Sequence, residues 1–162
     1  MPTHVVVDSP VGPLTLVAED GCLVGLYQDG QRHLPPRSSF GPRDDHALPV
    51  VREQLAAYFD GSLETCDLPL ALSGTPFQLA VWAALRQIPY GATCTYSELA
   101  EAVGRPMAVR AAGAANGRNP VCIVVPCHRV VGAGGALTGY AGGTARKGFL
   151  LEHERRSLTL FA

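Results

Sequence analysis

The first quarter of the chain alternates short apolar runs with turn residues, a pattern typical of antiparallel β-strands. The runs cover residues 4–8, 13–18 and 22–27, with proline or glycine in the breaks between them. Breaks of this length are typical of hairpins, so a three-stranded antiparallel meander is expected. Residues 29–46 are rich in Pro, Arg, Ser and Asp and are expected to form a loop.

After the meander, the apolar positions recur at the spacing of a helix face. Residues 47–60 predict a helix that Gly61 ends, and residues 66–72 predict an extended segment before a Ser-Gly pair. This pair marks the expected boundary between a domain at 1–73 and a domain at 74–162.

The second domain is expected to be mainly helical. Two capping boxes, Thr75–Gln78 and Thr95–Glu98, each predict the start of a helix. The second of these helices is short and stops at Gly104, and Pro106 can open a third that extends to Gly117. Two short helices joined by a tight glycine-containing turn have the outline of a helix-turn-helix.

The third predicted helix has a nearly smooth surface, because few of its side chains are long. Most of its side chains are alanine or glycine, and Arg110 is the only long side chain on it after Met107. A helix that reads base edges in the major groove usually carries several long polar side chains. A smooth helix can approach a backbone or a shallow minor groove closely, or it can pack against another helix, and both can hold on opposite faces.

Residues 121–125 predict a buried strand that ends at Pro126, because proline cannot donate to a sheet ladder. Cys127, His128 and Arg129 follow, where the chain is expected to turn away. A cysteine among valines is usually a core residue, but an unpaired charge is rarely buried beside it. The thiolate is the nucleophilic form of cysteine, and a neighbouring base makes it available at neutral pH.

Two later segments could complete a site around this cysteine. Residues 132–143 form a glycine-rich loop that contains Tyr140 and lacks the pattern of a phosphate-binding loop. The last helix is expected over residues 144–156 and carries Glu154. A histidine that acts as a base needs an acceptor to orient it, and Glu154 is the candidate for His128.

Composition excludes several classes of protein. With 162 residues and 47% hydrophobic content, the chain can bury a core, yet it has no apolar run long enough to span a membrane. Its N-terminus lacks the features of a signal peptide, so a cytoplasmic protein is expected. Five cysteines without a CxxC pair argue against a disulfide framework and against a zinc ribbon or finger.

The net charge of −1 hides an asymmetry. Residues 1–75 hold 4 Arg and Lys against 10 Asp and Glu, a balance of −6, and residues 76–162 hold 9 against 4, a balance of +5. The asymmetry favours contact between a polyanion and the second half only, although an ordinary charged surface would have the same composition.

The motifs around the cysteine resemble those of the O6-alkylguanine-DNA alkyltransferase family. PCHRV follows NGRNP and precedes LTGYAGG and RKxFLLEHE, and FQxxVW, IPYG and TYSELA lie upstream. The resemblance runs from about Thr75 to Glu154, and the first half resembles the family's small RNase H-like domain more loosely. It implies an α/β (α+β) fold: an N-terminal RNase H-like domain with an antiparallel sheet and a mainly helical C-terminal domain with a helix-turn-helix and the active-site cysteine.

The resemblance also implies an activity and the residues that perform it. An alkyl group of O6-alkylguanine, and of O4-alkylthymine, would pass irreversibly from DNA to Cys127, once per protein molecule. His128 would draw the thiol proton through a water, with Glu154 behind it. Tyr96 would give a proton to the departing guanine, and Asn119 would brace the turns around the site.

The implied partner is double-stranded DNA, bound through its minor groove with the damaged base flipped out, because a stacked base is out of reach of a thiol. Arg110 would fill the space that the base leaves. The implied DNA contacts are Arg110, Tyr96, Ala111, Gly113 and Arg118. The implied substrate pocket consists of Val125, Pro126, Tyr140, Ala141 and Gly142. No metal and no organic cofactor is implied, and a monomer is expected.

The sequence departs from the family's pattern in two places. Ala141 stands where some members have serine, and the family's zinc-bound phosphotriester-repair domain has no counterpart, so phosphotriester repair is not expected.

Three alternative functions would each show a different feature. A lesion-binding relative without chemistry replaces the acceptor cysteine, a helix-turn-helix regulator has a polar recognition helix, and a thiol hydrolase turns over many times.

Overall fold

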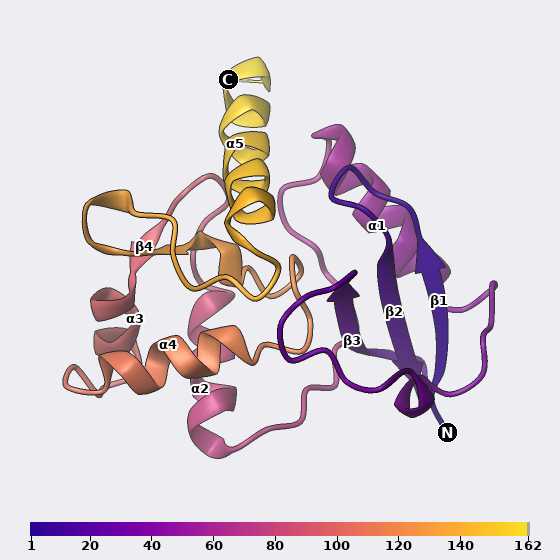
Figure 1. The fold of residues 1–162 in the computed structure, drawn as a ribbon. Coiled ribbons are helices and arrows are strands. Elements are labelled where there is room, and N and C mark those ends of the chain that lie inside the picture. Colours follow the sequence, from indigo (N-terminus) through magenta and orange to yellow (C-terminus); the bar gives the residue numbers. More distant parts are fainter. Residues whose placement is uncertain (162) are drawn as a thin grey trace.

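The computed structural model describes residues 1–161, with side chains as far as Leu158, and combines a three-stranded sheet and a two-stranded sheet with five α-helices (Figure 1). In chain order the elements are β1 (Thr3–Val7), β2 (Leu14–Glu19), β3 (Cys22–Gln28), η1 (Arg37–Phe40), α1 (Pro49–Asp60), α2 (Pro76–Leu85), β4 (Cys94–Thr95), α3 (Tyr96–Ala102), α4 (Val109–Gly117), η2 (Cys127–Arg129), β5 (Val130–Val131), η3 (Ala133–Gly135) and α5 (Thr144–Phe161).

Strands β1, β2 and β3 form the antiparallel meander that the alternating pattern predicts. Their inward positions are fully buried, among them Leu14, Leu16 and Leu26. The segment at 66–72 joins this sheet by a single bridge, between Leu70 and Leu23. The mixed α/β fold class is therefore confirmed.

One continuous core joins the sheet to the helices. Its buried side chains come from β2 and β3, from α1 and α2, and from α5. In Figure 1, α5 rises between the sheet with α1 on one side and α2, α3 and α4 on the other. Tyr58 of α1 and Leu150 of α5 belong to this core, and both are almost completely buried. The position of α5 places its side chains against both halves of the chain.

Both capping boxes form as predicted. The side chains of Thr75 and Thr95 accept from backbone N–H groups of the first turn, and those of Gln78 and Glu98 accept in return. Helix α4 begins at Val109, later than the expected start, because the chain makes a separate turn just before it. The helix-turn-helix outline of α3 and α4 is present.

The two faces of α4 differ as the sequence suggested. Ala112 and Ala115 are buried, and the Ala115 carbonyl accepts a 2.9 Å hydrogen bond from the indole of Trp82 in α2. Arg110 and Ala111 are exposed on the other side. Small side chains therefore serve close packing inside while the outer face remains smooth.

The prediction of a strand over residues 121–125 is wrong. These residues form consecutive tight turns, in which the amide of Val124 donates to the carbonyl of Cys122 and the amide of Val125 donates to that of Val121. Ile123 has a φ of 73°, a left-handed conformation that a β-branched residue rarely adopts. The run is apolar because it is buried, and burial alone does not make it a strand.

We predict that Ala112→Leu lowers the free energy of unfolding by about 1–3 kcal/mol, because the added side chain overpacks a filled interface. Ala111→Leu is the matched control on the exposed face, and its effect is expected to stay within about 0.5 kcal/mol. Urea unfolding followed by circular dichroism measures both. Equal losses in the two variants would contradict the assignment of the buried and exposed faces.

Candidate active site

A buried asparagine shapes the turns that lead to Cys127. Asn119 Nδ2 donates to the Val125 carbonyl at 2.8 Å, and Asn119 Oδ1 accepts from the Val121 amide at 3.0 Å. These bonds satisfy backbone groups that a strand would have paired with a neighbour. They also hold Ile123 in its left-handed conformation, a kind of backbone strain that costs about 1–3 kcal/mol of folding free energy.

The sheet fixes the same turns from the other side. The Leu26 amide of β3 donates to the Pro120 carbonyl at 2.8 Å, and the Cys122 amide donates back to the Leu26 carbonyl at 3.2 Å. The segment before Cys127 is thus held by backbone bonds to β3 and by the Asn119 side chain. The backbone bonds to β3 and the side-chain amide of Asn119 therefore determine the position of Cys127.

Cys127 begins a single 3₁₀ turn and is only 2% exposed. The neighbouring Cys122 thiol is the largest cause that lowers the pKa of Cys127; burial opposes this, while Asn119 and the charge of Lys147 add to the lowering. The pKa of Cys122 is raised well above its usual value by the same contact and by burial. Of the two adjacent thiols, Cys127 is therefore the one that ionises.

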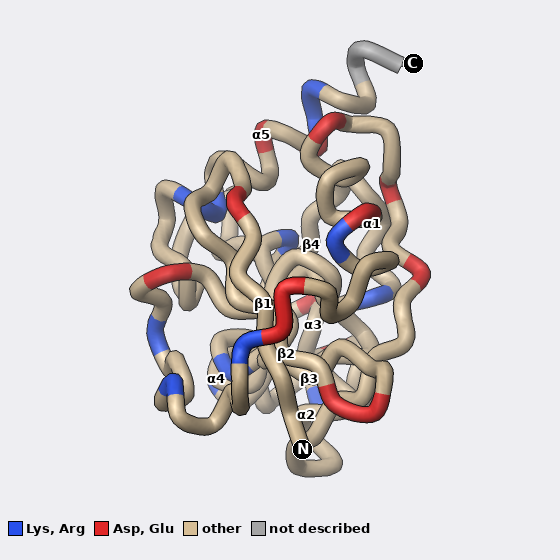
Figure 2. The backbone as a smooth tube through the Cα atoms, turned by 90° about the vertical axis from the view of Figure 1, so that its right-hand side faces the viewer, with Lys and Arg blue, Asp and Glu red and all other residues tan. Residues whose placement is uncertain are grey.

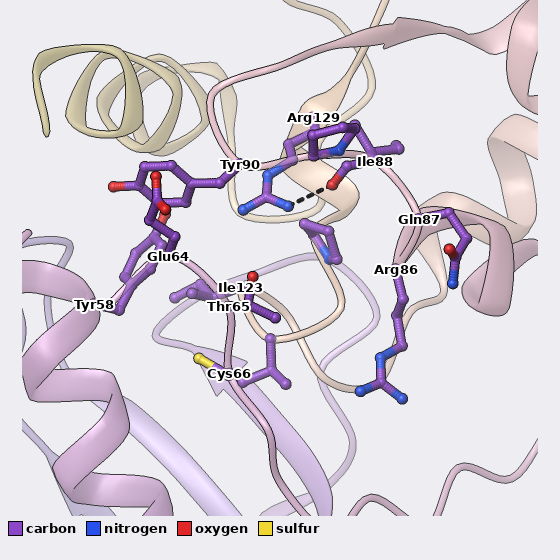
Figure 3. A pocket seen from close by; sticks show the side chains of 13 residues that line it. Tyr58, Glu64, Thr65, Cys66, Arg86, Gln87, Ile88, Tyr90, Ile123 and Arg129 are labelled. Atoms are coloured by element: carbon purple, nitrogen blue, oxygen red, sulfur yellow. Dashed lines mark hydrogen bonds between the residues drawn. The ribbon is translucent and has the colours of Figure 1, made fainter. Parts of the chain in front are cut away.

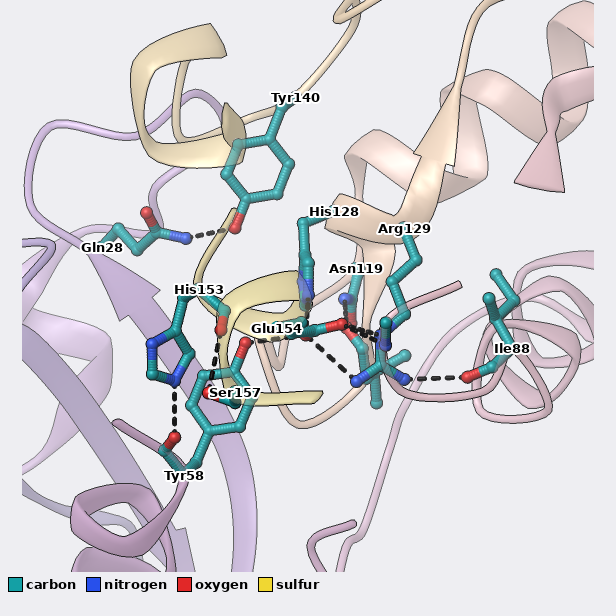
Figure 4. Close-up of polar contacts among 12 residues, drawn as sticks. Gln28, Tyr58, Ile88, Asn119, His128, Arg129, Tyr140, His153, Glu154 and Ser157 are labelled. Carbon is teal, nitrogen blue, oxygen red and sulfur yellow. Dashed lines mark hydrogen bonds and ion pairs between the residues drawn. The ribbon is translucent and has the colours of Figure 1, made fainter. Parts of the chain in front are cut away.

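The carboxylate of Glu154 lies at the centre of the site and is fully buried (Figure 4). It accepts five hydrogen bonds: from Tyr58 at 2.7 Å, from His128 Nε2 at 2.6 Å, twice from Arg129 at 2.9 and 3.1 Å, and from the Gly91 amide at 3.0 Å. Burial alone would raise the pKa of Glu154, but the bonds and charges of His128 and Arg129 outweigh it and lower the pKa to about 2. Glu154 is therefore ionised at neutral pH.

This carboxylate sets the protonation of His128. Burial lowers the pKa of His128, although Glu154 partly offsets the effect, so the imidazole is neutral at pH 7. Because Nε2 faces a carboxylate, Nε2 carries the proton. Nδ1 is then the basic nitrogen, and it is buried without a hydrogen-bond partner among the described residues. The arrangement can take a proton at Nδ1.

Arg129 extends the buried polar network beyond Glu154. Besides Glu154, its guanidinium donates to the Ile88 carbonyl at 2.8 Å and lies 5.6 Å from the ring centre of Tyr90 (Figure 3). A hollow of about 170 Å³ adjoins it, lined also by Tyr58 and Cys66. Burial raises the pKa of Cys66 to about 11, which leaves that thiol protonated.

The glycine-rich loop is anchored at two points above the site. The Tyr96 hydroxyl donates to the Thr138 carbonyl at 2.7 Å, and the Tyr140 hydroxyl accepts from the side chain of Gln28 in β3. Burial raises the pKa of Tyr96, and its bond to Thr138 only partly offsets this. Tyr96 therefore keeps a proton that it can donate.

The structure brings the expected pocket residues together. Val125, Pro126 and Tyr140 are buried, and Ala141 and Gly142 are half-buried beside them. The Val125 carbonyl already accepts from Asn119 Nδ2 and from the Cys127 amide. Both of its lone pairs are occupied, so this carbonyl does not offer a free acceptor to a base.

The expected DNA-contact residues form the outer surface of α4 and its ends. Arg110, Ala111 and Arg118 are exposed, and Gly113 is half-exposed against the ring of Tyr96, where a Cβ would lie 3.5 Å from the ring. Arg110 lies on α4 and Arg118 is its C-cap residue, and Figure 2 shows where Lys and Arg lie along the rest of the backbone. Positive charge next to a smooth surface suits a polyanion that approaches closely.

The sequence did not predict several residues that contact or influence the site residues. All of them are buried next to Glu154 or Cys127: Tyr58, Cys122, Arg129 and Lys147. Arg129 and Lys147 stand inside recognised motifs, which is the signal that could have singled them out. Tyr58 is distant in sequence, and only the tertiary fold brings it to Glu154.

The described residues lack two further features, a membrane-spanning helix and a metal-binding cluster. No helix among residues 1–161 is long and apolar enough to cross a membrane. No group of three or more His, Cys, Asp and Glu side chains in that range is placed to hold a metal ion. All five cysteines are free thiols.

We predict that Glu154→Gln lowers the free energy of unfolding at pH 7 by about 3–5 kcal/mol, because it leaves the Arg129 charge buried without a counter-charge. Glu154 has a folded pKa of about 2 against an ordinary 4.5. Its contribution is therefore complete above about pH 4.5 and is lost as the pH falls towards 2.

The measurement is denaturant unfolding of both proteins as a function of pH. Glu64→Gln, at an exposed carboxylate, removes the same charge and is expected to have little effect. The gap between the wild type and Glu154→Gln should narrow on acidification below pH 4.5. A gap that stays constant down to pH 2 would contradict the ionised state of Glu154.

Comparisons with known proteins agree with this site. Residues 76–156 match the family model described as 6-O-methylguanine DNA methyltransferase, DNA binding domain. The chain is 52% identical over 159 residues to a methylated-DNA–protein-cysteine methyltransferase of Mycolicibacterium paratuberculosis, covering 96% of each chain.

Solved structures extend the likeness to the whole fold. The crystal structure of the Mycobacterium tuberculosis O6-methylguanine methyltransferase has 48% identity and a TM-score of 0.90, and covers 100% of both chains. The crystal structure of Mycobacterium tuberculosis OGT in complex with DNA has 48% identity and a TM-score of 0.88, and covers 99% of both. With its motifs, its buried thiol and its fold in agreement, the chain belongs to the methylated-DNA–protein-cysteine methyltransferase family.

Proposed function

We propose that this protein repairs DNA by moving the alkyl group of O6-alkylguanine, and of O4-alkylthymine, to the thiol of Cys127. The observation that carries the proposal is the hydrogen bond between Glu154 and His128, the residue next to Cys127, which fixes the histidine proton on Nε2 and leaves Nδ1 as a base. The lowered pKa of Cys127 supports the same assignment.

The reaction is a single displacement. A bond forms between the Cys127 sulfur and the alkyl carbon, and the bond from that carbon to guanine O6 breaks. His128 Nδ1 takes the thiol proton through a water, and Tyr96 supplies a proton to the guanine, which would otherwise leave as an anion. The thiol loses one proton and the guanine gains one from Tyr96. Return of the thiol proton to the Tyr96 oxygen restores the tyrosine, so the net products are a thioether and guanine.

The thioether has no leaving group that water could displace, so each molecule reacts once. The protein is a stoichiometric reagent, which separates this function from that of a thiol hydrolase. Retention of Cys127 separates it from lesion-binding relatives without chemistry, and the smooth outer face of α4 separates it from a regulator that reads base edges.

DNA is proposed to bind through its minor groove against α4. Its small exposed side chains permit close approach, and Arg110 is the long side chain able to fill the gap left by a flipped base. Tyr96, Ala111, Gly113 and Arg118 complete the surface. Flipping is required because Cys127 is only 2% exposed and cannot move into a stacked duplex.

The remaining expectations are kept as proposals. The domain boundary is placed between residues 73 and 74, ahead of the capping box of α2. A monomer is proposed because every residue of the relay comes from one chain. The cytoplasm is proposed because an acceptor thiol has to stay reduced, and the five free cysteines suit a reducing compartment.

We predict that Cys127→Ser abolishes methyl transfer from duplex DNA, because a neutral hydroxyl is a far weaker nucleophile than a thiolate. Cys66→Ser is the matched control, since its thiol has a raised pKa and lies outside the relay. The assay follows the loss of O6-methylguanine from the DNA by chromatography. Transfer that survives in Cys127→Ser, or disappears in Cys66→Ser, would refute the assignment.

A second prediction concerns Arg110. Arg110→Ala should slow repair of O6-methylguanine in duplex DNA by at least about tenfold, because a few kcal/mol of unpairing is no longer compensated. The reaction with free O6-benzylguanine, which needs no flipping, should change less than about twofold. Arg156→Ala, an exposed cation of α5, serves as the control. Equal slowing on both substrates would overturn the flipping role.

A further inference from the structure

Lys147, in the first turn of α5, is a fully buried cation that the relay does not use. Its ammonium donates to the Thr138 carbonyl at 2.7 Å and lies 5.7 Å from the ring centre of Tyr96. Among residues 1–161 it forms no ion pair with a carboxylate. A buried charge is costly without a counter-charge, so its position calls for an explanation.

The charged and titratable groups that face Lys147 come from two elements. Tyr96 belongs to α3, and Cys127 and His128 belong to the 3₁₀ turn, where the charge of Lys147 lowers the pKa of both. Burial lowers the pKa of Lys147 to about 8, and Cys127 opposes the fall. Lys147 is therefore mostly charged at pH 7, and the Cys127 thiolate is the anion that can balance it.

The Thr138 carbonyl connects Lys147 to the proposed proton donor. Tyr96 and Lys147 both donate to this one oxygen, each at 2.7 Å. A single phenolic proton cannot serve Thr138 and a guanine together. When Tyr96 turns to the base, Lys147 stays as the donor to Thr138, so the loop over the site keeps an anchor.

We propose that Lys147 is a positioning residue for alkyl transfer, whose ammonium holds the loop at Thr138 and supplies the counter-charge for the Cys127 thiolate. This inference rests on the proposed function of Cys127 as acceptor. It adds a residue that acts through the thiol and the loop and does not touch the reacting carbon.

The test compares Lys147→Met and Lys147→Arg with the wild type. Iodoacetamide alkylation of Cys127, followed by peptide mass spectrometry across a pH series, reads the pH midpoint at which the thiol ionises. Methionine fills the site without charge, so the midpoint should move up by about one pH unit, and the reaction with O6-benzylguanine at pH 7 should slow about tenfold. Lys147→Arg should keep the pH midpoint and the O6-benzylguanine rate close to those of the wild type, because arginine keeps the positive charge.

Arg146→Met is the matched control. This neighbouring cation donates to the Val11 carbonyl at 3.1 Å, in the loop before β2, so the midpoint of the Arg146→Met variant should equal that of the wild type. Circular dichroism establishes that each variant is folded, and Lys147→Gln replaces Lys147→Met if the latter is not.

Different results would contradict the role of Lys147 and the proposed function of Cys127. A folded, uncharged Lys147 variant with the midpoint and benzylguanine rate of the wild type would overturn the role of Lys147. A wild-type protein whose Cys127 never accepts a benzyl group would instead refute the proposed function, while the iodoacetamide midpoints would still report on the charge of Lys147.

Discussion

The buried carboxylate of Glu154 is the constraint on which the site depends. Its five hydrogen bonds come from α1, from the loop before β4 and from the 3₁₀ turn that carries His128 and Arg129. A carboxylate removed from water is stable only when its partners satisfy it, so these elements have to meet at one point. The same requirement orders the histidine and selects its tautomer.

A second constraint acts on the backbone before Cys127. The chain turns repeatedly between Asn119 and Cys127, and its polar groups are paired with the Asn119 side chain and with Leu26 of β3. This explains how the sheet, which is remote from the predicted DNA surface, contributes to the chemistry. It holds the turn that presents the thiol, and the strain at Ile123 is borne by these bonds.

The sequence predicted those features whose causes are local. The meander follows from alternating apolar runs, and two helices begin where a threonine and a Gln or Glu three residues later can cap them. The strand at 121–125 failed because an apolar run reports burial and cannot reveal that Asn119 satisfies the backbone. The pairing of Glu154 with His128 was a candidate that the structure brings together. The contacts of Cys122, Tyr58 and Lys147 depend on packing between distant segments, which spacing does not encode.

The most direct test of the account mixes the protein with duplex DNA that carries one O6-methylguanine, and then records intact and peptide masses. The account predicts one added methyl group on the peptide that contains Cys127, with saturation at one per protein even when damaged DNA is in excess. A protein that binds this DNA and stays unmodified, or that gains its methyl group on another cysteine, would contradict it.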